Sequence, residues 1–140
     1  MNDPLYQAAA QVTLFCRMAL RQKLAIPIRP SDMGVLLYLD STEEEVTPAA
    51  VSSFMGISRP CTTALLKRLE RDGYISRHPS PSDGRCYSLA LTGKGHRMLS
   101  HVHEEYGRII QDLKDQMGNE RFSLFLEMIE ESNEILRKNL

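Results

Sequence analysis

The sequence predicts a mainly α-helical fold of the α+β class, with helices arranged around one short antiparallel β-hairpin. Two observations lead to this prediction. Within residues 47–72, two helical segments are separated by about three residues that include Gly56, and so short a link forces the helices to cross steeply. Residues 74–79 and 86–91 then alternate apolar and polar side chains on either side of the turn-forming run SPSDGR. Together they predict a winged helix-turn-helix.

Local signals mark the ends of the two crossing helices. Thr47 caps the first helix and is followed by a proline, whose missing N–H does no harm in a first turn. Gly56 ends that helix, because glycine adopts the left-handed conformation of a C-cap at little cost. Ser58 then caps the second helix, which runs from residue 59 to about residue 72 and stops at Gly73.

Residues 4–24 are expected to form an amphipathic helix, because their apolar side chains recur at spacings of three and four. Pro27 and Pro30 are expected to end it and to impose an extended connection. The stripe consists of Leu5, Ala9, Val12, Cys16, Ala19 and Leu20.

Ser31 or Asp32 is expected to cap the next helix, which is apolar on nearly every side, ends near Ser41 and should therefore be buried. After it, Glu43–Glu45 should form an exposed turn, and Val46 should begin a very short strand.

Thr92 is expected to cap a long helix over residues 92–117, which Gly118-Asn119 separates from a last helix over residues 119–140. The length suits one domain spanning residues 1–140, since domains typically hold ~100–200 residues. Within it, residues 30–95 should form the winged-helix lobe.

The composition of the chain indicates the cellular compartment in which the protein works. The three cysteines are odd in number, lie far apart and form no CxxC pair, so a disulfide framework is not expected. No apolar run approaches the ~20 residues of a membrane span. The first residues lack the basic start and apolar run of a signal peptide. We therefore expect a cytoplasmic protein without membrane contact.

Charge is distributed unevenly along the chain. The formal net charge is −1, yet residues 47–95 carry a net +4 while residues 1–46 and 96–140 carry −2 and −3. A basic centre between acidic flanks is typical of a DNA-binding lobe attached to a scaffold with another task. The charge pattern thus indicates double-stranded DNA as a partner of the central lobe.

The segment TPAAVSSFMGISRPCTTALLKRLERDGYISRHPSPSDGRCYSLALTGKG resembles the MarR family of bacterial regulators. The resemblance extends to element order over the whole chain and is strongest in the blocks MGISRP, LLKRLERDGYI and SDGRCYSLALTGKG. It implies a dimeric winged-helix repressor that binds palindromic operators and is released by a small ligand or an oxidant.

A recognition helix in the major groove needs short polar or basic side chains at its start. Arg59 is suited to a forked contact with guanine, and the threonine methyl groups to contacts with thymine methyls. The N-cap leaves the helix N-terminus free for a phosphate. The residues expected to face DNA are Ser58, Arg59, Pro60, Thr62, Thr63 and Lys67.

In the hairpin, Asp83 and Arg85 match the Asp-x-Arg pair of the family, whose aspartate steadies an arginine that enters the minor groove. This chain has Gly84 where the family often has a second arginine, which implies one phosphate contact fewer. Arg77 and Lys94 flank the hairpin and are expected to contact phosphates.

Residues 1–28 and 119–140 carry apolar stripes that the central lobe alone cannot cover, which predicts a homodimer joined through both ends of the chain. The alternative is packing of the same helices within one chain. A symmetric dimer would set two recognition helices ~34–36 Å apart, one turn of DNA.

Further alternatives concern regulation. The resemblance implies an effector pocket near Met33, Leu37 and Tyr38, while Cys16 is a candidate redox sensor or simply a buried apolar residue.

The histidines at 96, 101 and 103 do not share a helix face at chelating spacing, so no metal or other cofactor is expected. No catalytic motif is present, and the remaining alternative is a winged-helix module that binds an acidic protein.

Overall fold

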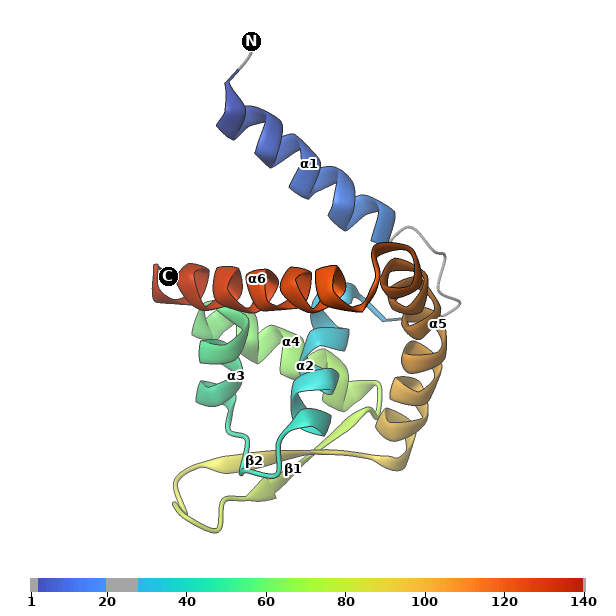
Figure 1. Ribbon diagram of the computed structural model, residues 1–140. Helices are drawn as coiled ribbons and strands as arrows, with labels where there is room; N and C mark the ends of the chain where they lie inside the picture. The colour runs from blue at the N-terminus through green and yellow to red at the C-terminus, as the bar shows by residue number, and fades with distance from the viewer. Residues whose placement is uncertain (1–2, 20–27, 140) are drawn as a thin grey trace.

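The computed structural model describes residues 3–19 and 28–139. It contains α1 (Pro4–Ala19), α2 (Pro30–Ser41), α3 (Pro48–Met55) and α4 (Arg59–Arg71), followed by β1 (Ile75–Pro79) and β2 (Tyr87–Leu91), and then by α5 (Gly93–Met117) and α6 (Asn119–Lys138). Figure 1 shows α2, α3, α4 and the hairpin gathered in one lobe, with α5 leading away from it and α6 returning above it. The mainly helical class with one two-stranded sheet is confirmed.

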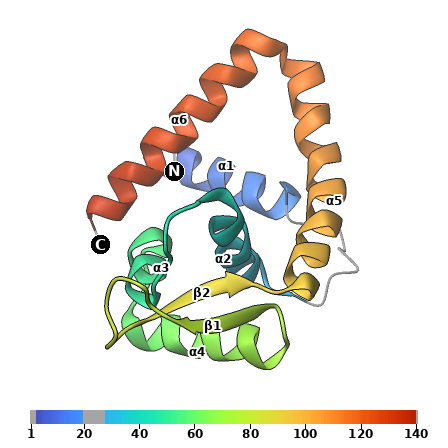
Figure 2. The same ribbon diagram turned by 90° about the horizontal axis from the view of Figure 1, so that it is seen from below.

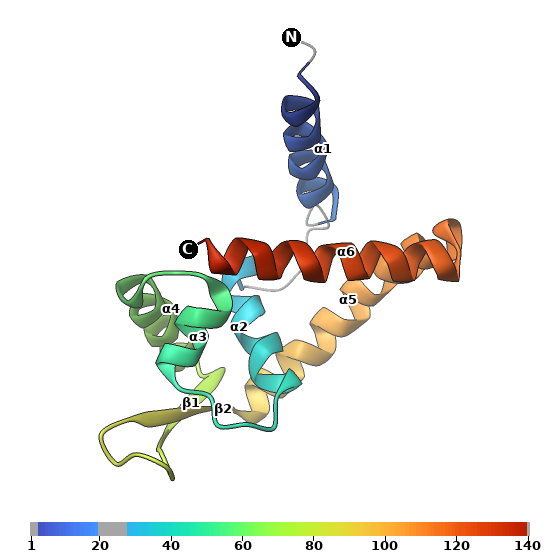
Figure 3. The ribbon, with the colours of Figure 1, turned by 60° about the vertical axis from the view of Figure 1, so that its left-hand side comes forward.

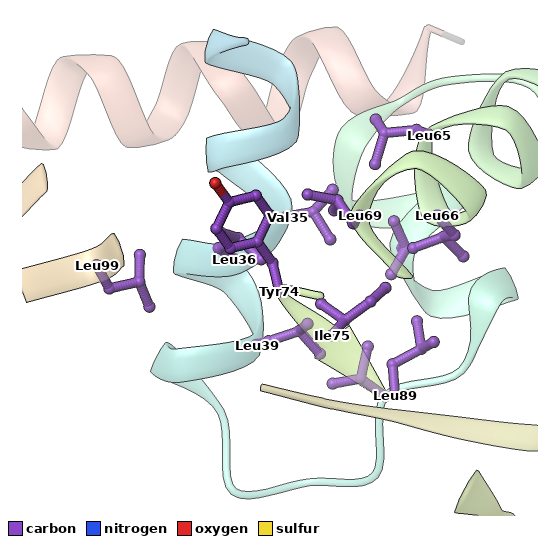
Figure 4. Close-up of a cluster of buried hydrophobic side chains, with 12 residues drawn as sticks. Val35, Leu36, Leu39, Leu65, Leu66, Leu69, Tyr74, Ile75, Leu89 and Leu99 are labelled. Atoms are coloured by element: carbon purple, nitrogen blue, oxygen red, sulfur yellow. The ribbon is translucent and has the colours of Figure 1, made fainter. Parts of the chain in front are cut away.

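The core of the lobe lies where α2, α4 and the hairpin meet. Apolar side chains from α2 and α4 converge on the strand side chains between them (Figure 4). Burying such side chains is the main favourable contribution to folding. The labelled cluster comprises Val35, Leu36, Leu39, Leu65, Leu66, Leu69, Tyr74, Ile75, Leu89 and Leu99.

The predicted caps of the crossing helices are present. Thr47 accepts a hydrogen bond from the amide of Ala50, and Gly56 adopts φ 63°, ψ 38° as the C-cap of α3. Ser58 accepts from the amide of Cys61 at the start of α4, and Thr92 caps α5 in the same way. Local sequence therefore determines both ends of the turn between α3 and α4.

The start of α2 differs from the expectation. The helix begins at Pro30, with Arg29 as an N-cap that makes no side-chain capping bond, so neither Ser31 nor Asp32 is the cap. Proline fits the first helical position because its φ is already helical and its N–H would have no partner there. Leu37 on this helix is exposed, so α2 is buried on most of its sides but not on all of them.

The hairpin is antiparallel, and its register pairs Ile75 with Leu91 and Pro79 with Tyr87. Val46 does not begin a strand, contrary to expectation. Its carbonyl instead accepts a single hydrogen bond of 2.8 Å from the amide of Leu89, which ties the α2–α3 connection to β2.

Helices α5 and α6 diverge from Gly118, and α6 runs back over the lobe toward α3 (Figure 2). There the Arg137 guanidinium donates a 2.8 Å hydrogen bond to the carbonyl of Phe54 and lies over the ring of that residue. The far end of α6 is thus attached to the helix-turn-helix of the same chain.

Helix α1 projects away from the lobe (Figure 3) and has no buried residue. Its Phe15 ring meets the ring of Phe125 on α6 edge-on, with centroids 5.7 Å apart. The part of the predicted first helix beyond Ala19 lies outside the described residues. Large apolar side chains on α1 and α6 remain exposed, namely Leu5, Val12, Leu14, Met18, Leu124, Leu126, Met128, Ile135 and Leu136.

Candidate nucleic-acid interface

The start of α4 presents a polar surface. The proline at its second position leaves the helix intact, and the Ser58 hydroxyl lies 3.3 Å from the Cys61 amide that it caps. Because the remaining N–H groups of the first turn have no intrahelical partners, this end of the helix attracts anions. Five of the six residues predicted to face DNA here are exposed: Ser58, Arg59, Pro60, Thr63 and Lys67.

Thr62 does not face outward, and its assignment to the exposed surface was wrong. Its side chain is only 2% exposed, lies 2.7 Å from the hydroxyl of Ser52 and donates to the carbonyl of Ser58. The reason is helical periodicity, because Thr62 shares a face with the buried Leu65 and Leu69 at spacings of three and seven. Thr62 therefore joins α4 to α3.

The tip of the hairpin is organised around Asp83. Its carboxylate accepts a 3.0 Å hydrogen bond from the backbone amide of Arg85, so Asp83 fixes the main chain from which that exposed arginine projects. The same carboxylate raises the pKa of the adjacent Cys86 thiol through its negative charge, with burial adding to the effect. Cys86 itself precedes β2 and is not part of the strand.

A groove of about 360 Å³ separates the start of α4 from the hairpin. Arg59 and Thr63 line it from the helix, and Arg85 lines it from the hairpin tip. Two elements that are separate in sequence thus bring positive charge to one concave surface. Such a positively charged surface attracts double-stranded DNA, which carries a negative phosphate charge about every 1.7 Å along its axis.

Arg77 and Lys94 are engaged within the protein. The Arg77 guanidinium pairs with Glu70 at 2.9 Å and lies over the ring of Tyr87 at 4.0 Å. The Lys94 ammonium donates a 2.6 Å hydrogen bond to the carbonyl of Asp72 at the end of α4. Arg77 therefore connects α4 to the hairpin, and Lys94 connects α4 to α5. Phosphate contacts by these two side chains remain a prediction.

An ion pair between α2 and α4 was not predicted. Asp32 is buried and accepts hydrogen bonds from Arg68 at 2.9 and 3.4 Å. This hydrogen bond to Asp32 raises the pKa of the arginine. The clue in the sequence was an acidic residue inside an otherwise apolar helix, since buried carboxylates need partners.

Arg137 was also not predicted as part of this surface. Together with Ser58 and Arg59 it lines a second hollow of about 610 Å³, between α3, the start of α4 and the end of α6. Nothing in the local sequence indicates this position, because it depends on how α6 folds back from Gly118.

The residues expected near an effector differ in their surroundings. Met33 is buried, Leu37 is 48% exposed, and the ring of Tyr38 stacks on that of Phe54 with centroids 4.1 Å apart. Their role toward an effector stays a prediction. Cys16 is exposed on α1 and so is not buried within the single chain.

Residues 3–19 and 28–139 contain no cluster of three or more histidine, cysteine or acidic side chains arranged to hold a metal ion. Within the same ranges, no helix combines the length and apolar character needed to cross a membrane.

The lobe and its basic groove define a winged helix-turn-helix protein. A profile of the MarR family matches residues 27–85. The transcriptional repressor MprA of Escherichia coli (strain K12) is 34% identical over a region covering 59% of this chain and 52% of that protein. The chain spans about half the length of the curated relatives it matches.

Solved structures share the fold over nearly the whole chain. The transcriptional regulator Tm0710 from Thermotoga maritima is 28% identical, with 97% of this chain and 96% of that chain covered and a TM-score of 0.58. A mutant of MarR from E. coli, complexed with operator DNA, is 21% identical over 92% of this chain and 93% of that chain, with a TM-score of 0.74. Residues 27–85 are thus similar to the MarR family of transcriptional regulators, and the chain shares the winged-helix fold of these solved structures.

Proposed function

We propose that this protein is a dimeric repressor that binds a palindromic operator in double-stranded DNA. The observation that carries the proposal is the groove between α4 and the hairpin, where Arg59, Thr63 and Arg85 lie together. The start of α4 would enter the major groove, and the hairpin tip would reach the adjacent minor groove.

Each side chain has a distinct part in this mechanism. Arg59 would donate two hydrogen bonds to a guanine edge, and the Thr63 methyl group would contact a thymine methyl. Arg85, held by the Asp83 turn, would enter a narrow minor groove whose negative potential attracts arginine. Lys67 is exposed one turn further along α4 and would contact a phosphate.

The two-fold symmetry of the proposed operator requires a dimer. The exposed apolar side chains of α1 and α6 support one, because monomeric soluble proteins rarely leave large contiguous apolar patches in water. Pairing both ends of the chain with a second copy would cover these side chains and set the two recognition helices about one DNA turn apart.

MprA is described as a repressor, and the MarR mutant was crystallised with operator DNA. By analogy we propose that this chain represses transcription in the cytoplasm of a bacterial cell. We further propose that a small molecule bound near Met33, Leu37 and Tyr38 weakens operator binding.

Selection of bound duplexes from a random pool tests the proposal, with the mass of the free protein measured alongside. We expect an inverted repeat with half-sites one helical turn apart and a mass of twice the chain. A pool that yields no enriched sequence, or a monomer that binds one half-site as tightly as the whole, would contradict the proposal.

A further inference from the structure

Glu45 connects the turn between α2 and α3 to the tip of the hairpin. Its carboxylate oxygen Oε2 accepts a 2.6 Å hydrogen bond from the hydroxyl of Ser82, a residue 37 positions away in the chain. The sequence predicted only an exposed acidic turn at Glu43–Glu45, so this contact adds a function for one of its three acids.

The contact continues toward the proposed DNA-binding arginine. The Ser82 hydroxyl lies 3.2 Å from that of Ser80, which is buried and accepts a hydrogen bond from the amide of Asp83. Asp83 in turn accepts from the amide of Arg85. An unbroken series of hydrogen bonds therefore runs from Glu45 to the main chain that carries Arg85.

Glu45 is held in its charged form. Hydrogen bonds from Ser80 and Ser82 lower the pKa of its carboxyl, and they outweigh the opposing effects of burial and of the negative charge on Asp83. An ionised acceptor makes a stronger hydrogen bond than a neutral one. Glu45 therefore accepts as a carboxylate throughout the neutral pH range.

The hairpin tip has few other attachments. Residues 81–86 are exposed, and a Cβ added at Gly84 would meet nothing within 4 Å. A two-stranded hairpin is at best marginally stable without further packing. The Val46–Leu89 hydrogen bond fixes β2 beside the same turn, but it lies below the tip.

We propose that Glu45 is a positioning residue for DNA binding, which anchors the hairpin tip so that Arg85 is held opposite the start of α4. This inference rests on the proposed function. The effect on DNA affinity is opposite to the ordinary one, because an acid beside a DNA-facing surface usually weakens binding by repelling phosphates. Removal of an anchoring acid weakens binding instead.

Glu45→Ala and Glu43→Ala provide the matched test, since both remove one negative charge from the same exposed turn. We expect Glu45→Ala to weaken operator binding on the order of fivefold, as the loss of one net hydrogen bond would. Glu43→Ala should leave binding unchanged or slightly tighter. Glu45→Gln keeps an acceptor oxygen and should restore most of the affinity.

Two further readouts separate positioning from a general loss of structure. Glu45→Ala should flatten base preference at the positions that Arg85→Ala affects, and preserve it at those that Arg59→Ala affects. Ser82→Ala should mimic Glu45→Ala, and the double variant should bind no more weakly than either single variant.

Hydrogen exchange of the backbone amides of residues 83–86 tests the anchor without DNA. Exchange should become faster in Glu45→Ala but not in Glu43→Ala. If the parent protein binds no duplex, the proposed function fails, and the exchange result still decides whether Glu45 anchors the tip. Unchanged exchange, or a Glu45→Ala variant that binds as tightly as the parent, would overturn the inference.

Discussion

The hydroxyls of Ser52 and Thr62 lie 2.7 Å apart and join the two helices of the helix-turn-helix. The same two hydroxyls contact the carbonyls of Ile57 and Ser58 in the turn between the helices. Since Thr62 is buried, this cluster sets the crossing of α3 and α4, and with it the direction in which Arg59 projects.

Thr62→Val should lower the free energy of unfolding by about 1 kcal/mol, because it keeps the shape of the side chain but removes the hydroxyl partner of Ser52. Urea denaturation measures this change. Thr63→Val, at the exposed neighbouring position, should leave stability within about 0.5 kcal/mol of the parent. A Thr62→Val protein of full stability with altered base preference would show that Thr62 contacts DNA after all.

Gly95→Ala should destabilise the fold, because a Cβ at this position of α5 would lie 2.2 Å from the carbonyl oxygen of Tyr74. Such overpacking against backbone typically costs about 1–3 kcal/mol. Gly107 lies on the same helix with nothing within 4 Å of an added Cβ, so Gly107→Ala should stabilise by roughly 0.5–1 kcal/mol. Thermal unfolding of both variants checks the pair, and equal melting temperatures would contradict the packing described for Gly95.

Arg59→Ala should cost about 1–3 kcal/mol of operator binding and relax base preference at one position of each half-site. Arg71→Ala is the matched control, since it removes the same charge from the exposed far end of α4. Quantitative binding to a set of single-base operator variants distinguishes the two. If Arg59→Ala weakens every duplex equally, Arg59 contacts phosphate and not a base edge.

Val12→Glu and Leu126→Glu should each shift the protein toward monomer, because both side chains are exposed in the single chain and would be buried in the proposed dimer. Sedimentation velocity across a concentration series measures the shift. Gln11→Glu adds the same charge at an exposed polar position of α1 and should leave the dimer intact. Dimers of equal affinity in all three variants would place the interface elsewhere.

Structural features that depend on only a few neighbouring residues were predicted correctly. Thr47, Ser58 and Thr92 cap their helices as expected, because a cap depends on the hydroxyl and the three residues that follow it. The start of α2 was predicted incorrectly because of Pro30. A proline can follow the end of one helix or occupy the first position of the next, and here it does the latter.

Contacts between distant residues could not be predicted. Asp32 and Arg68 are 36 positions apart, and Glu45 and Ser82 are 37 apart. Composition and periodicity indicate that these side chains are polar but not which partner each one meets. The exposed positions of Arg59 and Arg85 followed from the helix start and the turn, whereas the burial of Thr62 required attention to the face shared with Leu65.

If two winged-helix lobes read one palindrome together, binding to the selected operator should depend on both the salt concentration and the spacing of the half-sites. We expect one dimer per duplex and an affinity that falls linearly with salt on logarithmic axes, as phosphate neutralisation requires. We also expect a large loss of affinity when about half a helical turn (roughly 5 base pairs) is inserted between the half-sites. Equal affinity for the parent and spaced duplexes, or an affinity independent of salt, would rule out joint reading of the palindrome by two lobes.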